Sequence, residues 1–458
     1  MTSTLNPIAE DTAANPIAAV PATEGAALTV PLVTGESVGY ANFDHAASAP
    51  CLSSVRRAVD EFLPWYASVH RGAGFASKVS TTVYERAREA VHTFAGGRAC
   101  DTVVFTRNTT DSLNLLARAV PKGTAVVLFD TEHHAALLPW RGHHVRRLPA
   151  PRTRSEAVTA VAEALAECPE GPRLVVAAGA SNVTGELLPV AELTAVAHEA
   201  GARIVVDAAQ LAPHRRVSLR ELGADYVALS GHKLYAPFGA GALVGRSDWL
   251  RAAEPYLAGG GASKLVQGKE TGVEVVWNTG AERHEAGSPN TVGVYALGVA
   301  CTELATQWQQ IEEHETALLD RLTSGLAEVP GLRVLRLFDH DHQDHGEHQD
   351  QVGTISFVID GFQPNWVAAV LSAEYGIGVR DGAFCAHIAT RRLIGEAGGS
   401  GQQALRVSLG LGSTEEHVER LLGALQDITQ GRTRWDYTIR DGRWAPTPDP
   451  RPLPAFLS

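Results

Sequence analysis

Residues Tyr226–Gly245 read YVALSGHKLYAPFGAGALVG, and the fold we expect follows from this stretch. Its first five residues are a continuous apolar run, which is typical of a strand buried on both faces. Lys233 follows that strand, and Gly239 and Gly241 allow the backbone to approach another group closely. Because open α/β sheets bind ligands at the carboxyl ends of their strands, Lys233 is a candidate ligand-binding residue. Taken alone, the pattern is more typical of a solvated surface lysine.

Five further apolar runs of the same kind lie upstream or directly downstream of this lysine. Helical stretches such as Ser155–Glu167 and Val190–Ala200 separate several of them. Alternation of buried strands with helices predicts an α/β sheet with mainly parallel strands. We expect strands at Thr102–Thr106, Ala125–Phe129, Arg173–Ala178, Arg203–Asp207, Tyr226–Ser230 and Gly241–Gly245.

The chain divides into four segments by composition and pattern. Residues 1–38 are rich in Ala, Pro, Thr and Glu and are expected to form a flexible arm, or else an arm packed on a partner subunit. Residues 39–295 form the expected large domain. The N-terminal segment of this range is expected to contribute to the smaller domain as well. Residues 296–434 are expected to form a smaller α+β domain, and residues 435–458 an extended tail.

The elements expected in the smaller domain alternate between helix and strand. They are a long helix around Cys301–Leu326, strands within Leu332–Phe338 and Val352–Ile359, a helix near Pro364–Tyr375, a strand within Leu405–Gly410 and a final helix near Glu415–Ile428.

Composition limits the partners and the compartment. The formal net charge of −12 disfavours nucleic acid, because such a chain repels phosphate backbones. Five cysteines without a CxxC pair argue against a disulfide framework and for a reducing compartment. No Lys or Arg precedes Arg56 and no run of 18 apolar residues occurs, so we expect neither a targeting segment nor a membrane span. The predicted location is the cytoplasm.

The motif DAAQ at Asp207–Gln210 strengthens the case for Lys233. Asp207 ends a buried strand, and a carboxylate among apolar residues needs a cation as partner. A protonated pyridine nitrogen is such a cation, and the pairing keeps the ring an electron sink, as pyridoxal phosphate (PLP) chemistry requires. A lysine and an aspartate at neighbouring strand ends therefore predict a PLP site.

Three more strand ends carry residues that suit the same ligand. Thr109 and Thr110 stand at the start of a helix, where hydroxyl and free N–H groups form an anion site. His133 or His134, in DTEHHAALLPW, offers a flat ring for stacking on the cofactor. Asn182, in ASNVTGE, follows another strand and is expected at the same edge.

Together these segments resemble the class V aminotransferase family of fold-type I PLP enzymes, and within it the cysteine desulfurase and selenocysteine lyase branch. The resemblance runs from YANFDHAASAP at Tyr40–Pro50 to HVERLLGAL at His417–Leu425. It implies a seven-stranded sheet in the large domain, a smaller α+β domain at the C-terminal end, a small amino-acid substrate and a homodimer with shared active sites. It implies no metal.

The resemblance also implies a role for each matching residue. Lys233 would hold PLP as a Schiff base, Asp207 would pair with the pyridine nitrogen, and His133 would stack on the ring. Around the ring oxygen and the phosphate, the implied contacts are Gln210, Asn182, Thr109, Thr110, Ser230 and His232, and Asn182 would also bind the substrate.

Further residues are implied to serve the substrate or the neighbouring subunit. Arg406 matches the residue that clamps the substrate carboxylate, a task that suits a bidentate guanidinium. His70 and Arg71 match an active-site loop near the substrate. Ser288, in EAGSPN, stands where the family usually has Thr, in a segment that reaches the phosphate of the neighbouring subunit.

Cys385, in VRDGAFCAH at Val379–His387, matches the sulfur acceptor of the desulfurase branch. A thiolate there would attack the sulfur of a cysteine substrate, leaving a persulfide on Cys385 and releasing alanine. A sulfur-accepting protein would then be a partner. The branch often has His before this Cys, whereas this chain has Phe384. A small buried structural cysteine is the alternative interpretation.

Other reactions share this fold and this lysine. Transamination, epimerisation or β-elimination in a biosynthetic pathway is the alternative function, and a PLP-binding protein with a structural role is a third possibility. The tract DHDHQDHGEHQDQ at Asp339–Gln351 contains four histidines among acids. Such tracts bind metals, but its low complexity favours a solvated loop.

Overall fold

A computed structural model describes residues 20–338 and 351–457. Its largest element is a seven-stranded sheet, with five neighbouring strands parallel and one strand antiparallel to both its neighbours. This arrangement confirms the predicted α/β fold with a mainly parallel sheet. In spatial order the strands are β4 (Asp101–Thr106), β10 (Gly241–Arg246), β9 (Tyr226–Ser230), β8 (Arg203–Asp207), β7 (Arg173–Ala178), β5 (Ala125–Phe129) and β6 (His144–Leu148).

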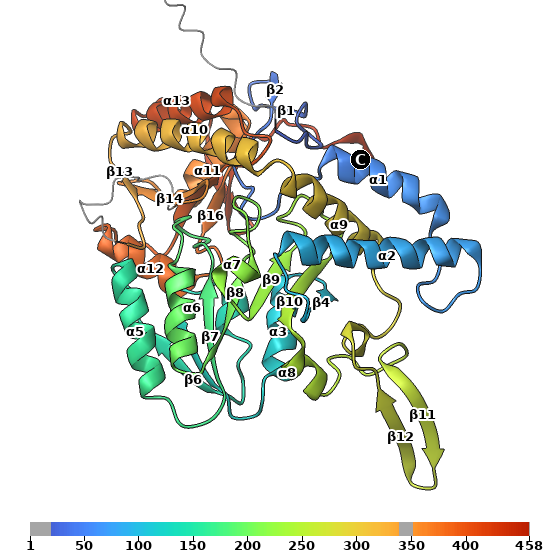
Figure 1. Cartoon of the computed structure of the whole chain (residues 1–458). Helices are drawn as coiled ribbons and strands as arrows, with labels where there is room; N and C mark the ends of the chain where they lie inside the picture. Colours follow the sequence, from blue (N-terminus) through green and yellow to red (C-terminus); the bar gives the residue numbers. More distant parts are fainter. Residues whose placement is uncertain (1–19, 339–350, 458) are drawn as a thin grey trace, which may run out of the picture.

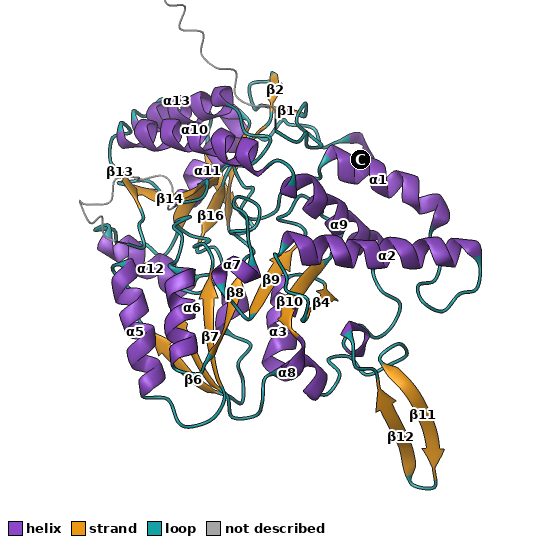
Figure 2. Cartoon of the chain, in the orientation of Figure 1, coloured by secondary structure: helices purple, strands orange, loops and turns teal. Residues whose placement is uncertain are grey.

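Strand β5 explains why the predicted strands are apolar throughout. Val127 and Phe129 point into one hydrophobic core, and Val126 and Leu128 point into another on the opposite face. Figure 2 shows helices on both sides of the sheet. Strand β6 was not predicted, because it is an edge strand whose sequence, HVRRL, contains two arginines and is largely exposed.

Each face of the sheet has its own helices. One core includes side chains of α1 (Ser53–Phe62), α2 (Phe75–Phe94), α5 (Arg154–Ala166), α6 (Val190–Glu199), α7 (Leu219–Leu222) and α9 (Thr291–Ala305). The other includes side chains of α3 (Thr109–Ala119), α4 (His134–Leu137) and α8 (Ser247–Ala252).

A second, antiparallel sheet has a core of its own, in which α10 (Trp308–Ala327), α11 (Pro364–Tyr375) and α13 (Glu415–Thr429) take part. Helix α12 (His387–Glu396) belongs to a separate small cluster. The N-terminal part of the chain also contributes to this unit, because β3 (Ala41–Asn42) pairs in parallel with β15 (Ile377–Gly378). In spatial order the sheet is β13 (Leu332–Val334), β14 (Thr354–Ile359), β17 (Ala404–Ser408) and β16 (Arg380–Gly382).

The predicted long helix around Cys301–Leu326 is wrong. The helix α9 ends at Ala305 and α10 begins at Trp308. The apolar residues of α9 pack against α2 and the large sheet, whereas Leu318, Leu319 and Leu322 of α10 pack in the core of the second sheet. Ile311, near the start of α10, still packs in the core that α9 uses, so α10 runs from one core to the other and the chain changes direction before it.

Parts of both ends are more ordered than the sequence predicted. Within residues 20–38, β1 (Thr29–Pro31) pairs with β2 (Ser37–Gly39), and Leu32 and Val33 are buried. The tail contains a hairpin of β18 (Tyr437–Arg440) and β19 (Arg443–Pro446), which packs on α11 through a hydrogen bond from Tyr437 to Glu374. Short 3-10 helices lie at Leu63–Trp65 (η1), Ala281–Arg283 (η2) and Ala455–Leu457 (η3).

A second hairpin, of β11 (Ser263–Lys269) and β12 (Gly272–Trp277), projects from the body of the large unit (Figure 1). Leu265, Val266 and Val273 are exposed on it. Its sequence alternates apolar with polar residues too irregularly to have been recognised as strands.

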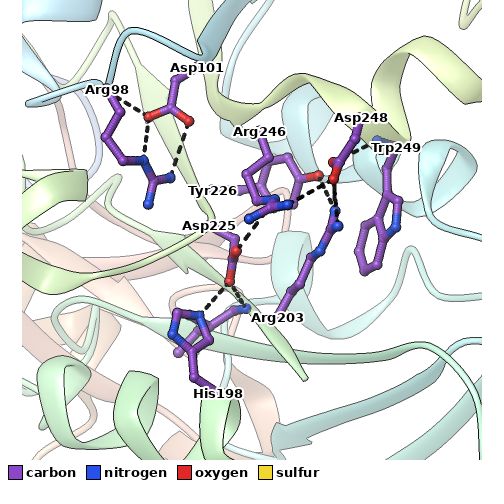
Figure 3. A network of polar contacts seen from close by, with 10 residues as sticks. Arg98, Asp101, His198, Arg203, Asp225, Tyr226, Arg246, Asp248 and Trp249 are labelled. Carbon is purple, nitrogen blue, oxygen red and sulfur yellow. Dashed lines mark hydrogen bonds and ion pairs between the residues drawn. The ribbon is translucent and has the colours of Figure 1, made fainter. Parts of the chain in front are cut away.

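The amino ends of the central strands are tied together by paired charges (Figure 3). Arg203 at the start of β8 makes two hydrogen bonds, of 2.7 and 2.6 Å, to the carboxylate of Asp248 on α8. The Asp225 carboxylate accepts from the backbone N–H of Ile204 at 3.0 Å and lies 2.9 Å from Nε2 of His198. These contacts join α6, α8, β8 and β9 at the edge of the sheet opposite the carboxyl ends.

Within residues 20–338 and 351–457, no helix has both the length and the apolar character that a membrane crossing requires. The His/Asp tract, apart from Gln351, lies outside the described residues. Among the residues that are described, no group of three or more His, Cys, Asp or Glu side chains could hold a metal ion.

Candidate active site

A cavity of about 220 Å³ lies at the carboxyl ends of the central strands. Eleven of the fourteen residues predicted for the site line it. They are Thr109, Thr110, His133, Asn182, Asp207, Gln210, Ser230, His232, Lys233, Cys385 and Arg406. The other three, His70, Arg71 and Ser288, line a different groove.

Lys233 lies just beyond the end of β9, and its Nζ donates a hydrogen bond of 3.1 Å to Oε1 of Gln210. Burial and the nearby Arg406 guanidinium lower the pKa of the lysine to about 8, against the opposing effect of Asp207. About a tenth of the amine is therefore uncharged at pH 7, far more than for an ordinary lysine, and the uncharged amine is the form that attacks a carbonyl carbon.

Asp207 ends β8 and is buried, with 6% of its surface exposed. Its Oδ1 accepts from the backbone N–H of Ala209 at 3.0 Å. Burial raises the pKa of this carboxyl above its ordinary value, although the Ala209 N–H and Lys233 act in the opposite direction. A cation bound beside it would favour the ionised form.

The start of α3 forms another wall of the cavity. The side chain of Asn108 caps this helix by accepting from the N–H of Asp111 at 3.0 Å. Oγ1 of Thr109 is buried and, within the described residues, has no hydrogen-bond partner. Gly241 permits this arrangement, because a Cβ there would come within 2.6 Å of Cα of Asn108. A buried, unpaired hydroxyl at a helix start is suited to an anionic ligand.

His133 caps the short helix α4, with its Nδ1 accepting from the N–H of Ala135 at 3.0 Å. Burial, followed by Lys233 and other nearby cations, lowers the pKa of this ring to about 4. The imidazole is therefore neutral near pH 7 and offers a flat face without repelling a cationic ring.

These groups fit PLP. An amine of lowered pKa suits an aldehyde, a buried carboxylate suits a pyridinium nitrogen, and the unpaired Thr109 hydroxyl suits a phosphate oxygen. Thr110, Ser230 and His232 line the same cavity.

Arg406 enters the cavity from β17 and is 3% exposed. It donates to the carbonyl oxygen of Asn182 at 2.9 Å and to Asp44 at 3.3 Å. Its Nε is buried without a hydrogen-bond partner among the described residues. Burial lowers the pKa of the guanidinium to about 10, although Asp44 opposes this shift. A guanidinium with an unused N–H can donate a hydrogen bond to a carboxylate ligand.

Cys385 lies in a turn at the cavity, and its side chain is not buried, so the alternative of a buried structural cysteine is wrong. Phe384 and Cys385 both have left-handed backbone angles, with φ of +52° and +54°. Asn182 donates to the carbonyl oxygen of Phe384 at 2.7 Å, and the N–H of His134 donates to that of Cys385 at 2.9 Å. These two hydrogen bonds hold a backbone conformation that residues other than glycine rarely adopt.

The thiol lies close enough to the catalytic candidates to influence their charges. A thiolate at Cys385 would weakly oppose the lowering of the pKa of both Lys233 and Arg406. The other cysteines do not line this cavity, and burial raises the pKa of Cys51, Cys168 and Cys301. Cys385 is thus the thiol positioned to react with a ligand bound there.

The structure does not bring His70, Arg71 and Ser288 to this cavity within one chain. They line a groove of about 930 Å³, beside the base of the β11–β12 hairpin. In that groove, Glu285 is held by Arg88 at 2.8 and 2.9 Å and by the N–H of Phe105 at 2.7 Å. The EAGSPN segment is therefore anchored at its first residue.

Sequence reasoning missed the two charged groups around Arg406. Asp44 belongs to the quoted YANFDHAASAP stretch and Arg380 to VRDGAFCAH, but neither was predicted to pair with Arg406. Nη1 of Arg380 lies 3.9 Å from Asp44. No local pattern reveals this cluster, because its members come from distant strands that meet only in the folded chain.

Comparison with known proteins agrees with this geometry. Residues 41–421 match the family described as aminotransferase class-V. A protein of Dickeya dadantii named cysteine desulfurase is 34% identical over 411 residues, which cover 86% of this chain and 93% of that protein. A cysteine desulfurase of Klebsiella pneumoniae is also 34% identical, over 425 residues that cover 86% of this chain and 94% of the relative.

Two solved structures share most of the architecture. The apo cysteine desulfurase of Thermococcus onnurineus superposes with a TM-score of 0.73 at 30% identity, covering 86% of this chain and 95% of that one. The cysteine desulfurase CsdA of Escherichia coli, solved as an S-sulfonic acid, gives a TM-score of 0.71 at 30% identity, with 86% and 96% covered.

Proposed function

The chain is an enzyme that belongs to the class-V aminotransferase family, as its motifs predicted, and on this premise we propose that it is a PLP-dependent cysteine desulfurase. The observation that carries the proposal is one cavity in which an exposed thiol, Cys385, shares the walls with Lys233, Asp207 and Arg406. A transaminase would need the lysine, the aspartate and the arginine, but it would have no use for the thiol.

When bound, PLP would supply an electron sink for charge that develops at the substrate Cα. Lys233 would hold the cofactor and then, as a free amine, take the proton from Cα of the substrate. Asp207 would keep the pyridine nitrogen protonated, and His133 would cover one face of the ring. Thr109, Thr110, Ser230 and His232 would bind the phosphate, with Gln210 and Asn182 near the ring oxygen.

Arg406 would bind the substrate carboxylate through its unpaired Nε, with Asp44 and Asn182 fixing the plane of the guanidinium. This clamp determines which way the substrate side chain points. Since Phe384 packs its ring against Arg406, with 5.0 Å from Cζ to the ring centroid, the clamp and the Cys385 turn are in direct contact.

Cys385 would then act as the nucleophile. Its thiolate attacks the substrate sulfur, the Cβ–S bond breaks, and an S–S bond forms on Cys385. The electron pair of the broken bond remains with the carbon skeleton, which gains protons and leaves as alanine. The exposed position of Cys385 leaves the terminal sulfur accessible to a sulfur-accepting protein thiol.

The test is to incubate purified protein with PLP and L-cysteine while sulfide, alanine and pyridoxamine phosphate are all measured. The proposal predicts alanine and sulfide in equal amounts in the presence of a reductant. Cys385→Ser should abolish both products and leave the visible absorbance of the bound cofactor intact. Full activity of Cys385→Ser, or pyridoxamine phosphate as the product, would contradict the proposal.

We further infer a homodimer in which each chain contributes to the other's site. His70, Arg71 and Ser288 lie together in a groove away from their own cavity, and the exposed apolar hairpin lies beside them. Sedimentation should give twice the mass of one chain. Replacing Val273 and Leu265 with Glu should yield monomers with weaker PLP binding, whereas dimers of unchanged affinity would contradict the shared site. A cytoplasmic location stays a prediction from the sequence.

A further inference from the structure

The turn that carries Cys385 has an unusual backbone for the residues in it. Phe384 and Cys385 are its central residues, and both have left-handed φ angles, of +52° and +54°. The N–H of Ala386 closes the turn by donating to the carbonyl oxygen of Ala383 at 2.8 Å. Turns with two left-handed central residues usually have Gly, Asn or Asp there. An aromatic residue keeps this conformation only where its surroundings hold it.

The side chain of Phe384 lies between the substrate clamp and a small apolar cluster. Its ring centroid is 5.0 Å from Cζ of Arg406. Away from the clamp, Phe384 belongs to a cluster of buried side chains that includes Val183 and Leu393. Since Phe384 is 4% exposed and Arg406 is 3% exposed, water does not screen the contact between the ring and the guanidinium. A desolvated cation–π contact is stronger than an exposed one.

Asn182 joins the same two residues by hydrogen bonds. Its carbonyl oxygen accepts from Nη1 of Arg406 at 2.9 Å, and its side-chain amide donates to the carbonyl oxygen of Phe384 at 2.7 Å. Asn182 therefore fixes the plane of the guanidinium and the main chain of Phe384 together, while the Phe384 ring covers one face of the guanidinium. A displacement of Arg406 would also displace Phe384, and with it the next residue, Cys385.

Phe384 has no direct part in the chemistry of the thiol, because a phenyl ring can neither accept nor donate a proton. Its hydrophobic neighbours account for its burial, but they do not account for the strained turn or for the stacking on Arg406. The contribution that its contacts allow is to the position of Cys385.

We propose that Phe384 is a positioning residue, which holds Cys385 in its strained turn by stacking its ring on the guanidinium of Arg406. The clamp and the nucleophile then keep a fixed relation to each other, so that a substrate bound through its carboxylate presents its sulfur to the thiol. The inference rests on the proposed function, because a fixed relation between Arg406 and Cys385 matters only if a substrate has to reach both.

The test compares two reactions of the same thiol in PLP-loaded protein. The first is formation of the persulfide on Cys385 in a single turnover with L-cysteine, followed by peptide mass spectrometry. The second is alkylation of Cys385 by iodoacetamide without L-cysteine, which needs an exposed thiolate but no clamp. A loss of position slows the first reaction alone, whereas a loss of thiol reactivity slows both.

Three variants of Phe384 separate the effect of the ring from that of the backbone. Phe384→Leu removes the ring and keeps an apolar side chain. Phe384→Gly removes the ring and also relieves the left-handed strain. Phe384→Tyr keeps an aromatic ring for the guanidinium. If Phe384→Leu does not fold, Phe384→Met, which also lacks the ring, takes its place.

A matched control loses packing in the same cluster but no contact with the clamp. Leu393 is buried beside Phe384 in that cluster and does not line the cofactor cavity. Leu393→Ala should lower the thermal midpoint, because it leaves a hole in a packed cluster. It should form the persulfide at nearly the wild-type rate.

We expect persulfide formation to be about 10-fold slower in Phe384→Leu and at least as slow in Phe384→Gly, which is the effect of losing one desolvated cation–π contact. Alkylation by iodoacetamide should stay near the wild-type rate in both variants. Phe384→Tyr should form the persulfide at nearly the wild-type rate, since the ring is retained.

A double-mutant cycle tests whether Phe384 acts through Arg406. In Arg406→Gln the ring has no cation to stack on. Adding Phe384→Leu to Arg406→Gln should therefore slow persulfide formation far less than Phe384→Leu does in the wild type. All members of the cycle are compared at the same high concentration of L-cysteine.

Persulfide formation at the wild-type rate in Phe384→Leu or Phe384→Gly would overturn the inference. So would fully additive effects in the cycle, an equal slowing of alkylation, or an equal slowing of persulfide formation by Leu393→Ala. These results would leave the proposed function standing, because the wild type still forms the persulfide. A wild type that forms no persulfide on Cys385 would overturn the proposed function, and the role of Phe384 with it.

Discussion

The two edges of the central sheet treat charge in opposite ways. At the carboxyl edge, burial moves the pKa values of Asp207 and Lys233 toward their uncharged forms. At the amino edge, hydrogen bonds from Arg203 and Arg246 outweigh burial and hold the pKa of Asp248 below its ordinary value. One edge thus pairs its charges within the chain, and the other leaves them available to a ligand.

The difference separates the residues that stabilise the fold from those that serve chemistry. Paired charges at the amino edge, shown in Figure 3, are satisfied before any ligand arrives. Charges at the carboxyl edge oppose folding until a cofactor and a substrate complete them, which is typical of functional sites. Substitutions of the reacting groups at the carboxyl edge should therefore lower activity without lowering stability, and substitutions at the amino edge should do the reverse.

The largest effect is expected from Lys233→Ala. Loss of the amine removes both the link to PLP and the base for the Cα proton, so alanine formation should fall about a thousandfold or more. The thermal midpoint of apoprotein should stay the same or rise, because a partly buried amine is removed. A clear loss of stability in Lys233→Ala apoprotein would break the comparison between the two edges.

A smaller loss of activity is expected from Asp207→Asn. The amide no longer stabilises a protonated pyridine nitrogen, so alanine formation should slow by about 10²-fold. The amide still accepts from the N–H of Ala209, so the fold should be unaffected. Steady-state rates and urea denaturation of the same preparation measure both effects, and equal rates in variant and wild type would remove Asp207 from the mechanism.

At the amino edge the expectation is reversed. Arg203→Met breaks a bidentate pair with Asp248, an aspartate that is 39% exposed on its side chain, so unfolding should become easier by about 1 kcal/mol. The rate of alanine formation per folded molecule should not change. A variant of normal stability and reduced turnover would show that the amino edge also serves the reaction.

The smallest effect is a change in pH dependence at the carboxyl edge. Burial, with Asp207 adding to it, raises the pKa of Glu132 from 4.5 to about 8. Between these values the folded chain holds a proton that the unfolded chain releases, so this group makes stability fall as pH rises from about 4.5 to 8. Glu132→Gln should make the free energy of unfolding fall less steeply with pH, as measured by urea denaturation between about pH 4.5 and 8. The same pH dependence in the variant and the wild type would mean that Glu132 is ionised in the folded chain.

The sequence was sufficient for the carboxyl edge because its signals are local. Continuous apolar runs predicted all but one strand of the large sheet, and residues directly after those strands have to meet at one edge. The strand β6 was missed because its exposed arginines break the apolar run. The amino-edge network could not be predicted, since Arg203 and Asp248 are 45 residues apart and nothing in their neighbourhoods marks them as partners.

Contacts between distant segments account for the other omissions. Asp44 reaches Arg406 across 362 residues of sequence. His70, Arg71 and Ser288 were assigned to the site by resemblance, but one chain alone places them in a separate groove. Periodicity and motif spacing carry no information about contacts between residues that are far apart in the sequence. These contacts depend on how the two sheets and their helices pack.

The most direct test of the account is to reduce PLP-loaded protein with borohydride and locate the added mass by peptide mass spectrometry. The chain has five lysines, and Lys78, Lys122, Lys264 and Lys269 are exposed and serve as internal controls. The account predicts a phosphopyridoxyl group on Lys233 alone, in nearly every chain. An unmodified Lys233, or the group spread over the exposed lysines, would contradict it.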